Sequence, residues 1–185
     1  MSEATRRTFL KISAGGSASV LGARQYARAT EANERVVVGI IGCGGRGGGL
    51  AQAFAEIADI AYVCDPDRSR CERLQGVVKA KQAVSDPRRV LDDRAVDAIV
   101  IATPDHWHAP LAILGCEAGK HVYVEKPLSH NFREGQLLVA AAKRAKVVVQ
   151  HGTQARSSPV IAKAVEMLRS GVIGNVLVAK AWNVQ

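Results

Sequence analysis

The chain has 185 residues, of which 48% are hydrophobic, enough to form the core of one domain or of one domain and part of another. Only 4% of the residues are aromatic and 23% are charged, which excludes an acidic disordered tail and an aromatic-rich nucleic-acid platform. No apolar run approaches the roughly 18 residues of a bilayer-spanning helix, so stable membrane insertion is not expected.

The formal net charge of +8 is shared between the amino terminus and the rest of the chain. Residues 1–29 contain five basic residues and one acidic residue, Glu3. Beyond Arg28 the basic residues are scattered, and the longest basic run is Lys143 to Lys146. A solvated surface therefore explains the charge better than a nucleic-acid site does, and no nucleic-acid partner is expected.

The amino terminus has the pattern of an export signal. Arg6 and Arg7 precede a weakly apolar segment, 12–23, and the tripeptide ending at Ala29 has the small-x-small form that signal peptidase accepts. Residues 1–29 resemble a twin-arginine signal, whose paired arginines are read by that pathway's export machinery. The preferred interpretation predicts a periplasmic or otherwise extracytoplasmic protein, exported already folded. The alternative is a basic amphipathic start to a cytosolic protein.

Residues 35–152 alternate short apolar runs with segments of helical period. The apolar runs, expected to be strands covered on both faces, are 36–41, 60–64, 98–102, 122–124 and 147–149. Helical spacing of apolar residues occurs within 51–58, 107–118 and 138–145, and further helices are expected after Asp67, as its N-cap, and after Pro87. The alternation predicts an α/β fold, a Rossmann doubly wound parallel sheet with right-handed crossovers.

Residues 153–185 are expected to lead from this domain into a second one. Apolar residues recur at helical spacing between Ile161 and Leu168, Gly171 and Gly174 follow, and 175–185 has the pattern of one more strand. These features predict a linking helix and the first strand of a truncated second α+β domain. We therefore expect the chain to be part of a longer protein, whose missing sheet could also form a homo-oligomer.

A glycine-rich turn follows the first predicted strand and opens the first predicted helix. Residues 42–47 satisfy G-x-G-x-x-G, in which Gly42 permits a tight turn, Gly44 lets a pyrophosphate approach the backbone, and Gly47 lets helix and strand pack closely. Backbone amides around Gly45 and Arg46 would then meet the phosphates at the helix N-terminus. A flexible turn is the alternative for the glycines alone.

An acidic residue occupies the second position that dinucleotide binding requires. Asp65 ends the second predicted strand, 23 residues after Gly42, where a carboxylate can accept both ribose hydroxyls of NAD. The same charge would repel the 2′-phosphate of NADP. Arg68 and Arg70 lie close in sequence, so NADP is not excluded. The pattern of strand, glycines, helix, strand and acid predicts NAD binding.

Three polar segments follow later strands, at the edge of the sheet where ligands bind in open parallel sheets. They are Thr103-Pro104-Asp105-His106-Trp107-His108, Glu125-Lys126-Pro127 and the segment from Gln150 to Arg156. His106 and His108 do not share a helix face, and no cysteine or second histidine cluster lies nearby in sequence, so no metal site is expected. Trp107 could cover the nicotinamide, but its position on the apolar stripe of its helix favours packing in the core.

The four cysteines show no C-x-x-C spacing, and they are expected to be small core residues and not a disulfide frame or zinc site: Cys43, Cys64, Cys71 and Cys116.

In this order and spacing, the glycine turn, T-P-x-x-x-H, E-K-P and G-x-Q-x-R resemble the glucose-fructose oxidoreductase and inositol dehydrogenase family, also called Gfo/Idh/MocA. The resemblance covers roughly Arg35 to Gln185. The resemblance implies that the dinucleotide is bound by Gly42, Gly44, Gly47 and Asp65, and that its ribose and nicotinamide end is lined by Thr103, Pro104 and His108. It further implies that Glu125 contacts the nicotinamide ribose and that Lys126, often followed by a cis proline in this family, contacts the substrate hydroxyl. Gln154 and Arg156 would lie at the edge of the substrate pocket.

The predicted activity is hydride transfer between a sugar or polyol hydroxyl and NAD(P). Alcohol oxidation needs a base for the hydroxyl proton, and the ammonium of Lys126 would support the developing alkoxide charge. A surface ion pair with Glu125 is the alternative for this lysine. The family's Asp and His acid/base pair, expected on a helix of the second domain, has no counterpart in these residues. Two other functions stay open: a glycosidase that oxidises a sugar transiently, eliminates the aglycone and keeps its NAD, and a non-catalytic nucleotide-binding fragment.

Overall fold

The computed structural model describes residues 35–182, and the predicted export signal at 1–29 lies outside them. Strands and helices alternate along the described part of the chain. The strands are β1 (Val37–Ile41), β2 (Asp59–Cys64), β3 (Gln82–Val84), β4 (Ala98–Ile101), β5 (His121–Glu125) and β6 (Val149–Gly152). The α-helices are α3 (Gly45–Ile57), α4 (Arg68–Val78), α5 (Arg88–Leu91), α6 (His108–Glu117), α7 (Phe132–Ala145) and α8 (Pro159–Arg169). Two short 3-10 helices are η1 (Asp105–Trp107) and η2 (Gln154–Ser157).

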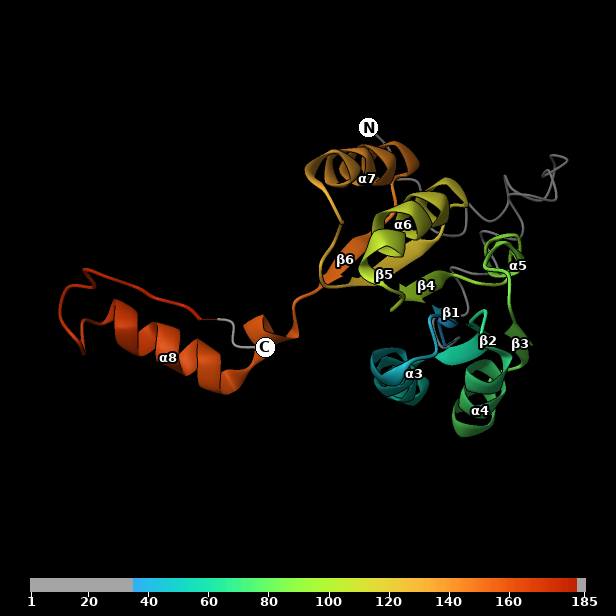
Figure 1. Ribbon diagram of the computed structural model, residues 1–185, viewed down its shortest axis with the longest axis horizontal. Coiled ribbons are helices and arrows are strands. Elements are labelled where there is room, and N and C mark those ends of the chain that lie inside the picture. Colours follow the sequence, from blue (N-terminus) through green and yellow to red (C-terminus); the bar gives the residue numbers. More distant parts are fainter. Residues whose placement is uncertain (1–34, 183–185) are drawn as a thin grey trace, which may run out of the picture. The chain divides into compact units, whose positions relative to one another are not determined.

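The strands form one parallel sheet in the order β3-β2-β1-β4-β5-β6. The chain winds outward from β1 in one direction to β3 and then crosses back to β4, so the order reverses between β1 and β4 (Figure 1). This confirms the predicted doubly wound fold. In such sheets the crevice at the reversal, outside the carboxyl ends of the strands, is where ligands bind.

The apolar pattern placed the sixth strand at 147–149, but β6 spans Val149–Gly152. Strand β3 is the element of the sheet that the apolar pattern did not predict at all. It has only three residues, lies at the edge of the sheet, and begins with an exposed glutamine. Because an edge strand is only partly covered by neighbouring elements, only part of its surface is removed from water, and its sequence does not need a continuous apolar run. Its position matters because Ser85, the residue after it, lines the cavity beside Asp65 described below.

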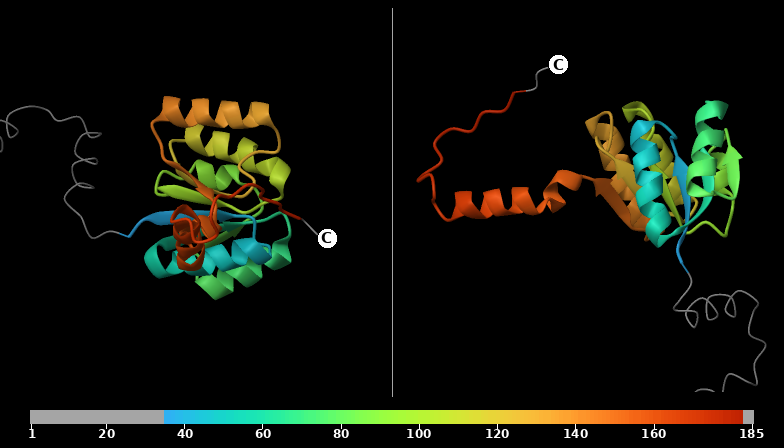
Figure 2. Two further views of the ribbon diagram at one scale, coloured as in Figure 1. Left: turned by 90° about the vertical axis from the view of Figure 1, so that its left-hand side faces the viewer. Right: turned by 90° about the horizontal axis from the view of Figure 1, so that it is seen from below.

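Helices cover both faces of the sheet, and each face has its own apolar core (Figures 1 and 2). Residues of α5, α6 and α7 pack with one set of strand residues, and residues of α3 and α4 pack with the other. Neighbouring strand residues alternate between the cores, as Ile99 and Ile101 do on one face and Val100 on the other. All three are buried, which explains why these strands are continuously apolar.

The segment after β6 differs from the prediction in one respect. Helix α8 forms where its apolar spacing indicated, and all of its residues are exposed. Residues 175–182, predicted to be a strand, have no regular secondary structure. Strand geometry depends on ladder hydrogen bonds with a neighbour, and no strand lies beside them in the described part of the chain. The second domain stays a prediction.

No helix within residues 35–182 combines the length and the hydropathy that crossing a membrane requires.

Candidate active site

Two of the glycines in the turn are required by the packing of the protein itself. Gly42 has a φ of +97°, and a Cβ there would lie 2.6 Å from the backbone of Ala102. A Cβ on Gly47 would lie 1.8 Å from the carbonyl oxygen of Gly42. The first glycine therefore permits the turn and the third permits close packing of α3 on β1, as the sequence predicted.

Gly44 is different, because nothing in the protein occupies the space beside it. A Cβ on Gly44 would have no neighbour within 4 Å, and the residue lines a cavity. Gly44 is the N-cap of α3, and no side chain caps the first amides of this helix. Unsatisfied amides and the positive end of the helix dipole attract anions. The missing side chain leaves open space beside these amides, which fits a phosphate group.

Asp65 connects the glycine turn to the end of β2. The residue is 8% exposed; Oδ2 accepts a hydrogen bond from the Cys43 amide at 2.7 Å, and Oδ1 accepts one from the Asp67 amide at 2.8 Å. Each carboxylate oxygen can accept a second bond, so both keep capacity for a ligand hydroxyl. Asp67 caps α4 as predicted, accepting from the amides of Ser69 and Arg70.

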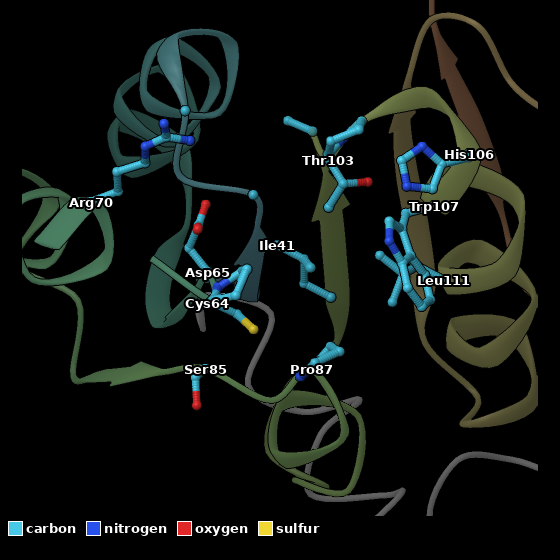
Figure 3. A pocket seen from close by; sticks show the side chains of 15 residues that line it. Ile41, Cys64, Asp65, Arg70, Ser85, Pro87, Thr103, His106, Trp107 and Leu111 are labelled. Carbon is cyan, nitrogen blue, oxygen red and sulfur yellow. The ribbon is translucent and has the colours of Figure 1, made fainter. Parts of the chain in front are cut away.

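One cavity lies beside Asp65 and has a volume of about 590 Å³. Asp65 and Arg70 stand on one side of it, and His106 and Trp107 of η1 stand on the other (Figure 3). Its lining also includes Gly42, Gly44, Ser85, Thr103 and Pro104. Trp107 was predicted in the core and is instead 50% exposed, because it lies in η1 before α6 begins and not on the covered stripe of that helix.

A second cavity, of about 270 Å³, shares Ala102 and Thr103 with the first. Its other lining residues are Arg46, Asp105, His108, Glu125, Lys126 and Gln154. The structure thus brings together predicted site residues that are up to 108 positions apart in sequence. Gly45 and Gly47 belong to the turn without lining either cavity, and the exposed Arg156 lines neither.

Glu125 and Lys126, adjacent at the end of β5, have opposite environments. Glu125 is buried and forms an ion pair with Arg46, while Lys126 is exposed toward the second cavity. The Lys126 amide donates to Glu125 Oε2 at 3.1 Å, and the bond from Lys126 to Pro127 is cis. The predicted alternative, an ion pair between Glu125 and Lys126, is not what the structure shows, because the carboxylate is held by Arg46.

Gly152 is a site residue whose role the sequence did not reveal. A Cβ at this position in β6 would lie 2.8 Å from the Tyr123 hydroxyl and 3.1 Å from Glu125 Oε1. The glycine therefore leaves space for the Glu125 carboxylate on the neighbouring strand. The sequence pattern contained Gly152 but gave no strand pairing, and the pairing of Glu125 with Gly152 explains its need.

His108 ties together two of the turns that carry the site. The side chain is 1% exposed; Nδ1 lies 2.6 Å from the Pro127 carbonyl oxygen and Nε2 lies 2.8 Å from the Thr103 carbonyl oxygen. Both ring nitrogens are therefore engaged by the backbone after β4 and β5. The ring also lines the second cavity, so a direct contact with a bound cofactor stays a prediction.

The cysteines of the described chain are small core residues, as predicted. Cys43, Cys64, Cys71 and Cys116 are buried and free. Burial, the largest cause, raises the pKa of Cys64 to about 12 and raises that of Cys43 as well. A thiol that resists ionisation is a poor nucleophile and metal ligand. Within residues 35–182 no group of three or more His, Cys, Asp or Glu side chains is placed to hold a metal ion.

Comparison with known protein families gives a match over most of the described chain. The sequence profile of the GFO_IDH_MocA family, described as an oxidoreductase family with an NAD-binding Rossmann fold, matches residues 36–153. This range runs from the residue before β1 to the residue after β6. It includes the glycine turn, Asp65 and the turns that carry His108 and Glu125.

The chain is similar to individual bacterial proteins that are named as dehydrogenases and as glycosyl hydrolases. The chain is 31% identical over 125 residues to scyllo-inositol 2-dehydrogenase (NAD(+)) of Bacillus subtilis, covering 68% of this chain and 36% of that protein. It is 30% identical over 162 residues to a glycosyl hydrolase family 109 protein of Shewanella pealeana, covering 80% of this chain and 35% of that protein. The chain thus spans about a third of the length of these relatives.

Among solved structures, levoglucosan dehydrogenase in complex with NADH has the same fold as the described chain. The TM-score is 0.67 and the identity is 29%, over 77% of this chain and 41% of that one.

Proposed function

Because the chain belongs to the GFO_IDH_MocA oxidoreductase family, we propose that the protein is an NAD(P)-dependent oxidoreductase acting on a sugar or polyol hydroxyl. One observation carries the proposal. The glycine turn, Asp65 and the residues after β4 and β5 line two adjoining cavities at the reversal of the strand order, where dinucleotides bind in doubly wound sheets. The names of the relatives, an inositol dehydrogenase and a levoglucosan dehydrogenase among them, support the substrate class.

The proposed coenzyme fits the two cavities with its diphosphate between them. The adenosine half would occupy the larger cavity, where the oxygens of Asp65 can accept its ribose hydroxyls. The diphosphate would lie beside Gly44 at the N-terminus of α3, and the nicotinamide half would extend into the smaller cavity. The buried charge of Asp65 favours NAD over NADP. Arg70, which lines the same cavity, is already paired with Asp67 at 3.1 Å.

The side chains around the smaller cavity suit alcohol oxidation. The bound nicotinamide supplies the acceptor for hydride. The exposed ammonium of Lys126 would lie against the substrate hydroxyl and stabilise negative charge as its proton leaves. Glu125 would accept from a ribose hydroxyl, and Gln154 would contact the substrate. His108 holds the turns that carry Thr103 and Pro127. We expect the base that takes the proton, and most of the substrate pocket, outside these residues.

A direct test uses the purified full-length protein with NAD⁺ and a panel of polyols and anhydrosugars: scyllo-inositol, myo-inositol and levoglucosan. The proposal predicts saturable NAD⁺ binding by calorimetry and net formation of NADH with at least one of them. A Lys126→Met variant, which keeps a side chain of similar length without the charge, should bind NAD⁺ and form little NADH. Absence of NAD⁺ binding in the native protein would contradict the proposal.

A second candidate function is favoured by the similarity to glycosyl hydrolase family 109 proteins. An enzyme of this kind would oxidise a sugar hydroxyl transiently, eliminate the aglycone and return the hydride. Its NAD would stay bound and no net NADH would form. Release of the aglycone from a nitrophenyl glycoside, with NAD retained by the protein after gel filtration, would favour this function over the dehydrogenase.

The paired arginines at positions 6 and 7 support export through the twin-arginine pathway. Replacing both by lysine should retain the protein in the cytoplasm of the producing cell, and immunoblots of the cytoplasmic and periplasmic fractions measure the result. Periplasmic recovery of the lysine variant, equal to that of the native protein, would contradict this route.

A further inference from the structure

Glu125 is a buried carboxylate whose cationic partner comes from the glycine turn. Arg46 Nε donates to Glu125 Oε1 at 2.6 Å, and Arg46 Nη2 forms an ion pair with the same oxygen. The Glu125 side chain is 4% exposed and that of Arg46 is 47% exposed. The hydrogen bond to Glu125 is the main reason that the pKa of Arg46 lies above its ordinary value. The pair joins the start of α3 to the end of β5.

Arg46 stands where the two halves of a dinucleotide would meet. It is the second residue of α3, directly after the first helical residue, Gly45. The larger cavity reaches the turn at Gly44, and Arg46 lines the smaller cavity. A ligand that occupies both cavities must therefore pass its diphosphate beside the base of the Arg46 side chain. Since this side chain is half-exposed, some of its five N–H donors remain available.

A guanidinium binds carboxylate and phosphate with the same planar geometry, so Glu125 and a diphosphate compete for it. The diphosphate offers more charge and more acceptor oxygens. If Arg46 turned to the diphosphate, Glu125 Oε2 would still accept from the Lys126 amide. Glu125 Oε1 would lose its donor and would stand without one at the edge of the smaller cavity. A buried carboxylate oxygen needs a new donor, and a ribose hydroxyl of the same ligand can supply one.

We propose that Arg46 changes partner when the coenzyme binds, pairing with Glu125 in the free protein and with the diphosphate in the complex. The proposal rests on the proposed coenzyme function and adds a role for this ion pair. In the free protein Arg46 neutralises Glu125 and holds it in place. In the complex the exchange frees Glu125 Oε1 for the ribose, so the second ribose contact forms only after the diphosphate is bound.

The exchange predicts that the affinity of the protein for ADP is limited by the ion pair between Arg46 and Glu125. ADP carries the diphosphate but lacks the second ribose, so its binding must break the ion pair without gaining the contact that follows. Removing the charge of Glu125 should therefore strengthen ADP binding, because Arg46 is already free. Removing Arg46 should weaken ADP binding and should also abolish the benefit of the Glu125 substitution.

The experiment is a double-mutant cycle in the full-length protein, with ADP affinity measured by calorimetry for the native protein, Glu125→Gln, Arg46→Met and the double variant. We expect Glu125→Gln to bind ADP about 3- to 10-fold more tightly and Arg46→Met to bind it about tenfold more weakly, as for a charged hydrogen bond. The double variant should match Arg46→Met. Adenosine, which has no phosphate, is the control and should bind equally to all four proteins.

Three results would overturn the exchange. Glu125→Gln could leave ADP affinity unchanged, or weaken it, which would mean that the ion pair does not oppose diphosphate binding. Glu125→Gln could strengthen ADP binding equally in the Arg46→Met background, which would show direct repulsion by the carboxylate and not exchange. A native protein that binds adenosine, ADP and NAD⁺ at none of the concentrations tested would refute the coenzyme function together with the exchange.

A second measurement uses only the native protein and so does not depend on the folding of the variants. In nitrogen-15-labelled protein, the Nε–H resonance of Arg46 should shift on addition of ADP and not on addition of adenosine. An Arg46 signal that ADP leaves in place would contradict the exchange.

Discussion

Two glycines of the same turn should respond in opposite ways to the addition of one methyl group. At Gly47 the new Cβ would lie 1.8 Å from the Gly42 carbonyl oxygen, where real Cβ contacts are essentially never below 3.0 Å, so α3 must move away from β1 by more than an ångström. Overpacking of this kind costs about 1–3 kcal/mol of folding stability. Gly47→Ala should therefore lower Tm by roughly 3–10 °C.

At Gly44 the new Cβ meets no protein atom within 4 Å, and the backbone angles, φ −70° and ψ −172°, suit any residue. Alanine is a poorer N-cap than glycine but reduces the entropy of the unfolded chain, so the net change in stability should be within about 1 kcal/mol of zero. The methyl group would instead occupy the space assigned to the diphosphate. The loss of one or two charged hydrogen bonds should weaken the binding of NAD⁺ by about 1.5–3 kcal/mol, which is roughly 10- to 100-fold in affinity.

The assays are thermal unfolding without ligand and calorimetric titration with NAD⁺. Gly49→Ala is the matched control, since Gly49 is exposed on the same helix and lines neither cavity, and a Cβ there would have no neighbour within 4 Å. It should gain about 0.5–1 kcal/mol of stability and keep its NAD⁺ affinity. If Gly44→Ala binds NAD⁺ as well as the native protein does, or unfolds as readily as Gly47→Ala, the reasoning about the turn is wrong.

Asp65→Ala should weaken the binding of NAD⁺ by about 1–3 kcal/mol, because a ribose hydroxyl loses a charged acceptor. An unchanged NAD⁺ affinity in calorimetry would show that Asp65 does not bind the ribose. Lys126→Met in the full-length protein should lower kcat by about 100-fold or more and leave the Kd for NAD⁺ nearly unchanged, whereas equal turnover would exclude the lysine from catalysis. His108→Ala should lower the free energy of unfolding in urea by about 2–4 kcal/mol, because a buried ring that contacts the carbonyl oxygens of Thr103 and Pro127 is lost and leaves a cavity; a loss below about 1 kcal/mol would mean that the ring does not tie the two turns together. The raised pKa of Cys64 predicts that stability falls as pH rises from about 9, where the thiol of the unfolded chain ionises, toward about 12, and that this decline is shallower in Cys64→Ala; an equal decline would contradict the assigned pKa.

The sequence predicted the elements that carry a strong local signal. Continuous apolar runs marked β1, β2, β4 and β5 because these strands are largely covered on both faces. The run at 147–149 reached only the first residue of β6, an edge strand whose residues are not all buried. The glycine turn was recognisable because each glycine of a dinucleotide-binding turn has its own steric role. Asp65 was recognisable because the residue that binds the ribose follows this turn at a characteristic spacing. The three-residue strand β3 gave no such run, and a strand over 175–182 had a suitable pattern but no partner to pair with.

Side-chain partners across the sheet were harder to predict than backbone elements. Nothing local indicates that Arg46 reaches Glu125, 79 positions later, or that both nitrogens of His108 are taken by carbonyl oxygens. Gly152 looked like part of a motif, and only its position beside Tyr123 and Glu125 shows why a Cβ would be crowded there. Such contacts depend on strand order and register, which a single sequence does not contain.

The most direct test of the central claim is a crystal structure of the protein with NAD⁺. The account predicts that diphosphate oxygens accept hydrogen bonds from the backbone amides around Gly44 and Arg46, and that the adenosine ribose lies against Asp65. Coenzyme bound elsewhere, or this crevice closed by side chains at saturating NAD⁺, would contradict it.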